Sequence, residues 1–303
     1  MKIFDAHLHT ETENICPEEL LRRFDSIGIY GATIMSPPPE SPVTSIGVSY
    51  DTRMRCLAQW TEGRRDRLFP VFYIHPLEKD AVAKAKDAAQ WGVDAFKIIY
   101  DCLYPYEEAS MKLLSAFAEL GKPVMFQSGI LWNGVDSSKY NRPLGVEKLV
   151  EIPGLRVSMG HCSWPWTDEC IALYGKFLNA YVTNPNASAE MFFDLTPGTP
   201  VIYRKDLIMK LFGSGYDTPH NIMYGTDCTA NNYNTRWAES WIRRDRALME
   251  EAGAGEAVIE HYFGLNYLRF IGRLPKNFTH VIPVSDAADA WTIEYANRMM
   301  QEE

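Results

Sequence analysis

The chain alternates between short apolar runs and longer segments in which apolar residues recur at helical spacing. Buried parallel strands have near-continuous apolar runs, so these runs predict strands. We find eight of them, each followed by a polar or helical segment. The predicted strands are Ile3–His9, Ala32–Met35, Leu68–Ile74, Ala95–Tyr100, Pro123–Gln127, Arg156–His161, Ala180–Thr183 and Ile222–Asp227.

The segments between these runs predict amphipathic helices, which are Glu18–Ser26, Tyr50–Glu62, Glu78–Trp91, Glu108–Leu120, Gly145–Glu151, Asp168–Leu178 and Lys205–Phe212. No Gly-rich phosphate-binding fingerprint follows the first strand. Such alternation predicts a parallel sheet covered by helices. With eight units and no evident linker, we predict a single (β/α)8 TIM barrel over residues 1–273 rather than a doubly wound sheet. Residues 274–303 are predicted to form a C-terminal extension packed on the barrel.

Composition narrows the classes of function. The 303 residues are 46% hydrophobic, enough for a large core, and the net charge of -9 argues against a nucleic-acid-binding protein. The sequence has neither a secretion signal nor an apolar run long enough to span a membrane, which predicts a cytoplasmic protein. Its six cysteines include no Cys-x-x-Cys pair, so neither a zinc knuckle nor a disulfide framework is indicated.

Polar residues stand at the ends of the otherwise apolar predicted strands, where a barrel carries its active site. An ionisable group buried there costs free energy unless it is paired or ligated. Each residue alone has a structural alternative, such as a solvated histidine pair, a hydrogen-bonded loop histidine or a helix N-cap aspartate. Together they indicate a reaction centre, and they are His7, His9, Lys97, Gln127, His161 and Asp227.

Several of these residues lie within longer sequence segments that together resemble a known family. The segments are Phe4-Asp5-Ala6-His7-Leu8-His9, Gly92–Lys97, Lys122–Gly129, Gly160–Trp166, Tyr224–Asp227 and Phe263–Asn266. Together they resemble the amidohydrolase superfamily of metal-dependent barrel enzymes, in particular the branch related to aminocarboxymuconate-semialdehyde decarboxylase. The resemblance runs through most of the chain.

The resemblance implies that His7, His9 and Asp227 bind a divalent metal, with zinc as the expected ion and manganese as the alternative. Asp227 and His161 are the implied catalytic residues. Asp227 would accept the proton of a metal-activated water, and His161 would hydrogen-bond the substrate or that water. The implied reaction is hydrolysis of a small ester, lactone or amide. Nonoxidative decarboxylation of a small carboxylic acid is the alternative, because both reactions use the same strand-end residues.

The chain departs from the family pattern on its fifth strand. Family members ordinarily have a histidine metal ligand where this chain has Gln127. An amide oxygen is a poorer partner for zinc than an imidazole. The metal could be held more weakly, Lys97 could contribute, or the barrel could have lost metal and serve a binding role. Some superfamily members carboxylate a lysine on the fourth strand, whereas an unmodified ammonium is no ligand.

Aromatic and polar residues near the strand ends predict the walls of a small-molecule site. Besides Gln127 and Lys97, we assign Tyr100 and Trp164 to substrate binding. Arg142, in the long loop after the fifth strand, could pair with a substrate carboxylate, although a surface salt bridge would explain it equally well. The resemblance also suggests a homodimer.

Overall fold

Eight parallel strands form one sheet in the computed structural model, which describes residues 1–41, 43, 47–184 and 188–274. Neighbouring strands in this sheet follow one another along the chain, as a (β/α)8 barrel requires. They are β1 (Ile3–Asp5), β3 (Ile29–Met35), β4 (Leu68–Tyr73), β5 (Ala95–Ile98), β6 (Val124–Phe126), β7 (Arg156–Met159), β8 (Glu190–Asp194) and β9 (Ile222–Met223).

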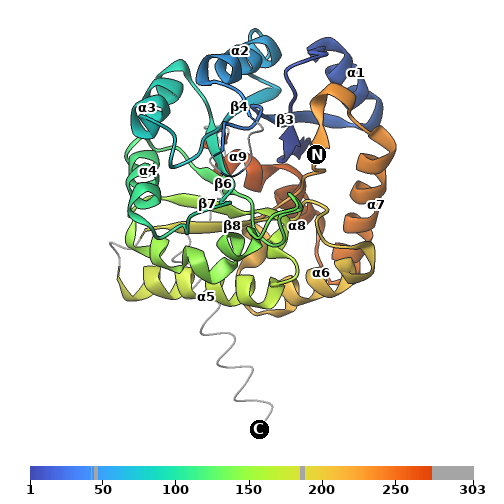
Figure 1. The fold of residues 1–303 in the computed structure, drawn as a ribbon. Helices are drawn as coiled ribbons and strands as arrows, with labels where there is room; N and C mark the ends of the chain where they lie inside the picture. The colour runs from blue at the N-terminus through green and yellow to red at the C-terminus, as the bar shows by residue number, and fades with distance from the viewer. Residues whose placement is uncertain (42, 44–46, 185–187, 275–303) are drawn as a thin grey trace.

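Seven helices surround these strands in a ring (Figure 1). They are α1 (Pro17–Ile27), α2 (Tyr50–Thr61), α3 (Ala81–Trp91), α4 (Glu108–Glu119), α5 (Thr167–Thr183), α6 (Arg204–Gly213) and α7 (Thr235–Glu251). The helix predicted over Gly145–Glu151 is a 3-10 segment, η2 (Pro143–Glu151). The predicted barrel is therefore confirmed, with a 3-10 segment standing in for one helix of the ring.

The first and last strands meet and close the barrel. Ala6 N donates to Tyr224 O at 2.9 Å, and Asp227 N donates to His7 O at 3.0 Å. Beyond this point β2 (Leu8–His9) pairs in parallel with β10 (Cys228–Thr229). Closure therefore places the residues after β1 beside those after β9.

The interior of the barrel is mostly apolar below its C-terminal end. Residues that alternate inward along the strands pack into one buried cluster, among them Ala6, Met35, Val71, Ala95, Met125, Phe192 and Met223. The opposite, N-terminal end is covered by α9 (Asn266–Phe270), whose Tyr267 bonds Thr33 inside the barrel at 2.7 Å. Ionisable side chains are thereby concentrated at the carboxyl ends of the strands, where barrel enzymes do their chemistry.

The prediction of the seventh strand was wrong. Residues 180–183 form the last turn of α5, and the strand is β8, ten residues further on. β8 pairs in parallel with β7, with Val157 opposite Met191 and Met159 opposite Phe193. The β-branched and aromatic residues at 181–183 favour a strand intrinsically, but α5 continues through them. The error matters because β8 ends in Asp194.

Within the described ranges, no helix is long and apolar enough to cross a membrane. The predicted C-terminal extension lies, from residue 275 onwards, outside the described residues.

Candidate active site

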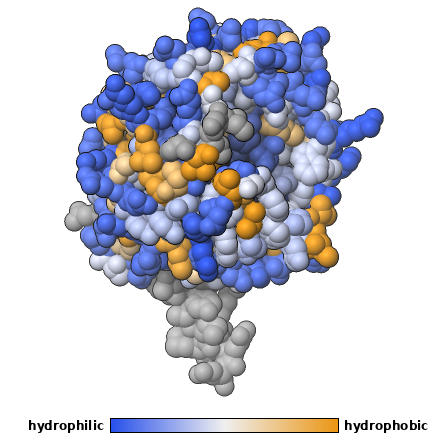
Figure 2. All heavy atoms as spheres, in the orientation of Figure 1, coloured by the Kyte–Doolittle hydropathy of each residue, from blue (hydrophilic) through white to orange (hydrophobic). Residues whose placement is uncertain are grey.

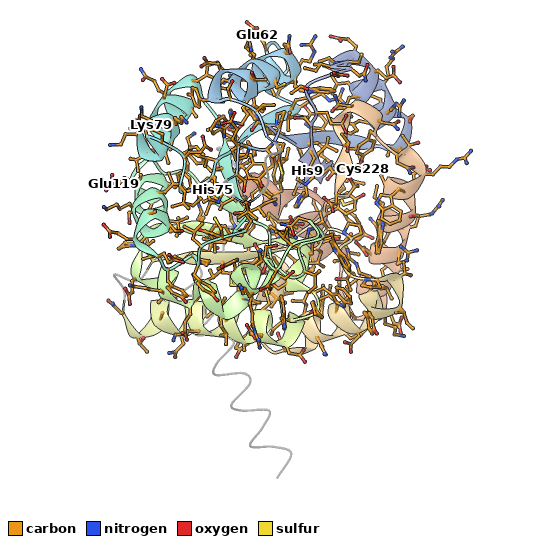
Figure 3. All side chains as sticks on the ribbon, viewed as in Figure 1. His9, Glu62, His75, Lys79, Glu119 and Cys228 are labelled. Carbon is orange, nitrogen blue, oxygen red and sulfur yellow. The ribbon has the colours of Figure 1, made fainter. Side chains whose placement is uncertain are left out.

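Three side chains from the two ends of the sheet converge at the mouth of the barrel. His7 Nε2 lies 3.1 Å from His9 Nε2 and 3.6 Å from Asp227 Oδ1, and His9 Nε2 lies 3.2 Å from Asp227 Oδ1. His9 and Cys228, the neighbour of Asp227, come from the paired strands β2 and β10 (Figure 3). The structure thus brings together the three residues that the sequence proposed as metal ligands.

The spacing of these three atoms fits a single divalent ion. Nitrogen and oxygen ligands lie about 2.0–2.2 Å from Zn²⁺, so two ligands of one ion are about 2.8–3.6 Å apart at octahedral or tetrahedral angles. The three separations at this site, 3.1, 3.2 and 3.6 Å, fall in that range. Two imidazoles and a carboxylate are also suitable donors for such an ion. The residues present therefore fit a metal.

Asp194 fixes the orientation of His7. Its Oδ2 lies 2.5 Å from His7 Nδ1, and both side chains are fully buried. A carboxylate only accepts hydrogen bonds, so His7 carries its proton on Nδ1 and directs the lone pair of Nε2 at His9 and Asp227. Sequence reasoning missed Asp194 because it misplaced the seventh strand. The charged end of the apolar run Met191–Asp194 was the signal that would have found it.

Asp5 joins the two segments that carry the proposed ligands. Its Oδ1 accepts from His7 N at 3.1 Å and from Thr226 N at 3.0 Å. Its Oδ2 accepts from Thr226 Oγ1 at 2.6 Å and from Tyr233 at 2.9 Å. Burial raises the pKa of Asp5 to about 6, although these four donors oppose the shift. Asp5 belongs to the first sequence motif, but the sequence alone predicted no role for it.

His161 and Asp227 both occupy the left-handed backbone region, which is uncommon for residues with a side chain. Their φ angles are 55° and 57°, and Cys162 and Ser163 continue the left-handed turn. Each such residue costs on the order of 1–3 kcal/mol, so the surrounding structure must enforce it. Ser163 is held by a 2.7 Å hydrogen bond to Ser128. The turn places the His161 ring 5.4 Å from the His7 ring.

The charges at this site suit metal binding. Burial, together with the positive charge of Lys97, lowers the pKa of His7 to about 4, and burial also lowers the pKa of His161. Both imidazoles are thus neutral near pH 7. Burial alone would raise the pKa of Asp227, but opposing interactions, of which the hydrogen bond with His9 is the largest, hold that pKa well below its usual range. Neutral imidazoles and an ionised carboxylate are the protonation states that ligands require.

Comparison with known families decides the assignment. A family model described as Amidohydrolase matches residues 4–273, nearly the whole described chain. The chain belongs to the amidohydrolase family. This confirms the family that the strand-end motifs suggested. Comparison with curated proteins gives no match.

Solved structures show the same fold as this amidohydrolase. A 2,6-dihydroxybenzoate decarboxylase from Rhizobium matches with a TM-score of 0.62 and 12% identity, over 90% of this chain and 99% of that one. A probable 2-pyrone-4,6-dicarboxylic acid hydrolase from Acinetobacter baumannii, with citric acid bound, gives a TM-score of 0.58 at 12% identity, over 90% of this chain and 100% of that one. At such identity the likeness establishes the barrel and leaves the reaction to be argued from the site.

Gln127 and Lys97 also reach the centre of this amidohydrolase. Gln127 Oε1 lies 3.2 Å from His161 Nε2. Lys97 is fully buried on β5, with Nζ 3.4 Å from His7 Nε2. Burial lowers the pKa of Lys97 to about 8, and the charges of the nearby carboxylates oppose the shift. A buried cation therefore stands next to the proposed metal ligands.

The remaining predicted substrate-binding residues have other partners. Tyr100 is buried and its hydroxyl bonds Ser110 of α4 at 2.6 Å. Arg142 Nε donates to Glu169 at 2.9 Å while its side chain stays 55% exposed. Trp164 follows the left-handed turn, and its ring lies 6.1 Å from that of Tyr203. Of the three, only Trp164 is next to the turn that carries His161.

A second group of metal-type side chains, His75, Asp101 and Cys102, lies after β4 and β5 (Figure 3 labels His75). His75 Nδ1 accepts from Leu77 N at 3.1 Å, so the ring proton is on Nε2 and is donated to Asp101 at 3.1 Å. No lone pair is left on that nitrogen for an ion. The hydrogen bond between His75 and Asp101 links the loop after β4 to the loop after β5. Two further histidines have structural partners: His220 bonds Asp217 at 2.6 Å and His261 bonds Asn266 at 3.0 Å.

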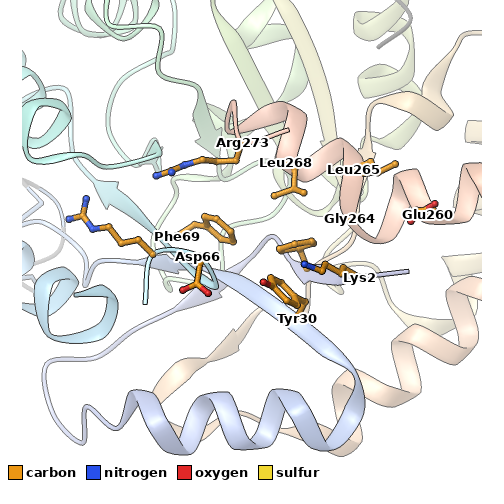
Figure 4. A pocket seen from close by; sticks show the side chains of 11 residues that line it. Lys2, Tyr30, Asp66, Phe69, Glu260, Gly264, Leu265, Leu268 and Arg273 are labelled. Atoms are coloured by element: carbon orange, nitrogen blue, oxygen red, sulfur yellow. The ribbon is translucent and has the colours of Figure 1, made fainter. Parts of the chain in front are cut away.

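A cavity of 410 Å³ opens at the other end of the barrel (Figure 4). It is lined by residues at the start of strands and by the segment that covers the N-terminal end, including Lys2, Phe4, Tyr30, Phe69 and Leu268. His7 follows the carboxyl end of β1, so this cavity is separate from the candidate active site.

Proposed function

We propose that this amidohydrolase is a metal-dependent hydrolase of a small ester, lactone or amide. The convergence of His7 Nε2, His9 Nε2 and Asp227 Oδ1 within 3.6 Å of one another carries the proposal. Zinc is the proposed ion, because imidazole and carboxylate ligands suit it, and manganese is the alternative. When bound, the ion would act as a Lewis acid and lower the pKa of water at the site.

The side chains around the proposed metal site would have different roles in the reaction. Asp227 is ionised near neutral pH and its side chain is 34% exposed, so it can accept a proton from an attacking water that enters the mouth. His161 is buried and neutral, and it would orient the reacting oxygen of the substrate. Asp194 holds His7, and Asp5 holds the backbone at His7 and at Thr226, the neighbour of Asp227.

The loops around the mouth suit an organic substrate with apolar parts. Large apolar side chains are exposed after β6 and β8, with Trp132 at 78% and Ile202 at 80%. Figure 2 shows hydrophobic residues gathered near the middle of the face seen there, among hydrophilic ones. Such surfaces on loops above a barrel are typical of binding sites.

Nonoxidative decarboxylation is the second candidate, because buried Lys97 favours a substrate that carries a carboxylate. A cation with 0% exposure next to His7 would stabilise a substrate carboxylate in the centre. A lactone that carries a carboxylate would use the same contact. A panel of lactones, esters and aromatic acids, assayed for hydrolysis products and for released CO₂, separates the two reactions.

Metal analysis of protein purified without chelator tests the proposal. We expect about one equivalent of a divalent transition metal, or its uptake when Zn²⁺ or Mn²⁺ is added. His9→Ala should abolish that uptake, whereas His220→Ala, which removes a histidine paired with Asp217, should not. Less than about a tenth of an equivalent with no uptake would refute the metalloenzyme and favour a metal-free binding role. A cytoplasmic location and a homodimer are further proposals from the sequence, and light scattering would test the dimer.

A further inference from the structure

The loop that follows β8 lies against the imidazoles of both His7 and His161. Thr196 Oγ1 is fully buried, 3.1 Å from His161 Nδ1 and 3.5 Å from His7 Nδ1. Gly198 approaches the His161 ring so closely that an added Cβ would stand 2.5 Å from its Cγ. The loop therefore forms one wall of the His161 site.

The partners of His161 determine which ring nitrogen carries its proton. Gln127 donates through Nε2 to Ile130 O at 3.5 Å, so its Oε1 is the atom that faces His161 Nε2. An amide oxygen only accepts hydrogen bonds, hence His161 is protonated on Nε2. In the neutral ring Nδ1 is then an acceptor, and the hydroxyl of Thr196 donates to it.

The same loop is tied to the partner of His7. Asp194 Oδ1 accepts from Thr196 N at 2.9 Å, while its Oδ2 accepts from His7 Nδ1. His7 is thus protonated on Nδ1 and His161 on Nε2. One segment of three residues, from Asp194 to Thr196, holds the two imidazoles in opposite tautomers.

We propose that Thr196 is a positioning residue that holds His161 as a hydrogen-bond donor through Nε2. His7 presents a lone pair to the ligand cluster, whereas His161 presents an N–H to Gln127 Oε1. A substrate oxygen that replaces Gln127 Oε1 would receive this hydrogen bond. The effect on turnover rests on the proposed function, but the tautomer of His161 does not.

Nitrogen NMR of the metal-free protein tests the assignment directly. The chain has 7 histidines, so a histidine-selective ¹⁵N label gives few signals, and His161→Asn identifies those of His161. At about pH 8, where the imidazoles are neutral, we expect His161 to be protonated on Nε2 and His7 on Nδ1. Thr196→Val, which keeps the shape but removes the hydroxyl, should shift the His161 Nδ1 signal to that of a nitrogen without a hydrogen bond. Thr196→Ser should restore it.

Thr199→Val is the matched control in the same loop. The hydroxyl of Thr199 is buried and has no hydrogen-bond partner among the described residues, so its loss should leave the His161 signals and turnover unchanged. With an active substrate, Thr196→Val should lower kcat about fivefold, the equivalent of one neutral hydrogen bond, with KM nearly unchanged. Thr196→Ser should recover most of the loss.

Two results would overturn the proposal. One is a wild-type His161 protonated on Nδ1, which needs no variant and so does not depend on whether Thr196→Val folds. The other is an Nδ1 signal that stays the same in Thr196→Val. If the tautomers are as expected but no hydrolysis is found with any substrate, the proposed function fails and the role of Thr196 in holding His161 stands.

Discussion

The hydrogen bond between Asp194 and His7 gives a direct test of how the barrel orients a proposed metal ligand. We consider the change Asp194→Asn, which keeps the size of the side chain and removes its charge. The wild-type carboxylate uses Oδ2 for His7 Nδ1 and Oδ1 for Thr196 N. Asparagine has a single acceptor oxygen, so its NH₂ group must face one of these two N–H donors.

The expected loss follows from the burial of this contact. Both side chains are at most 1% exposed, so no water can replace the missing acceptor. Leaving one buried donor without a partner costs about 1–3 kcal/mol. Removing a group that orients a metal-ligating histidine typically weakens metal binding about 10–100-fold, which equals about 1.4–2.7 kcal/mol. Asp194→Asn should therefore bind metal 10–100-fold more weakly and unfold more easily.

Competition with a chromophoric chelator measures the affinity for Zn²⁺, and urea denaturation of the metal-free protein measures stability. Asp217→Asn is the matched control, because Asp217 also accepts from a histidine Nδ1, at 2.6 Å from His220, but stands apart from the reaction centre. It should leave metal affinity unchanged. An Asp194→Asn protein that binds Zn²⁺ within about twofold of the wild type would refute the role of this carboxylate.

Three further changes test other parts of the structure. Gln127→His should tighten Zn²⁺ binding at least about tenfold if the new imidazole becomes a metal ligand. Unchanged affinity in the chelator assay would contradict the placement of residue 127 at the vacant ligand position. Burial would raise the pKa of Glu78, but the ion pair with Arg53 outweighs it and lowers that pKa below 4.5. The ion pair is therefore fully stabilising at pH 7, and this stabilisation is lost as pH falls below about 4.5. Glu78→Gln should lower the free energy of unfolding, measured with urea, by less in acid than at pH 7. A loss of unfolding free energy that does not depend on pH would contradict this. Asp245→Ala leaves Arg204 buried without its ion pair and should cost about 3–5 kcal/mol of unfolding free energy; under about 1 kcal/mol would be inconsistent with a buried pair.

The sequence was sufficient for the barrel and for the residues at the mouth. Apolar runs of four to seven residues identify strands well when helices with amphipathic spacing separate them, as for β4, β5 and β6. The rule that chemistry lies at the carboxyl ends of strands then selected His7, Lys97, Gln127 and Asp227, which the structure places in mutual contact or next to His161.

The seventh strand shows where this reasoning ends. The segments 180–183 and 190–194 are both short and rich in β-forming residues, so local propensity does not separate them. The structure resolves the ambiguity by pairing: Met191 and Phe193 lie in register with β7, while α5 continues to Thr183. Pairing with a distant segment determines which of the two segments forms the strand. The local sequence pattern alone therefore could not identify Asp194 and Thr196 as residues of the site.

Gln127 is the residue whose meaning changes most between sequence and structure. As a departure from the family pattern it suggested a metal ligand replaced by a weaker one. In the structure its carbonyl oxygen accepts the Nε2 proton of His161 and its amide bonds Ile130 O. This hydrogen bond directs the carbonyl oxygen at His161, and an amide oxygen is a poorer ligand for zinc than an imidazole. A metal at this site would then rest on His7, His9 and Asp227, and Gln127 would instead keep the His161 donor in place until a substrate oxygen takes over its hydrogen bond.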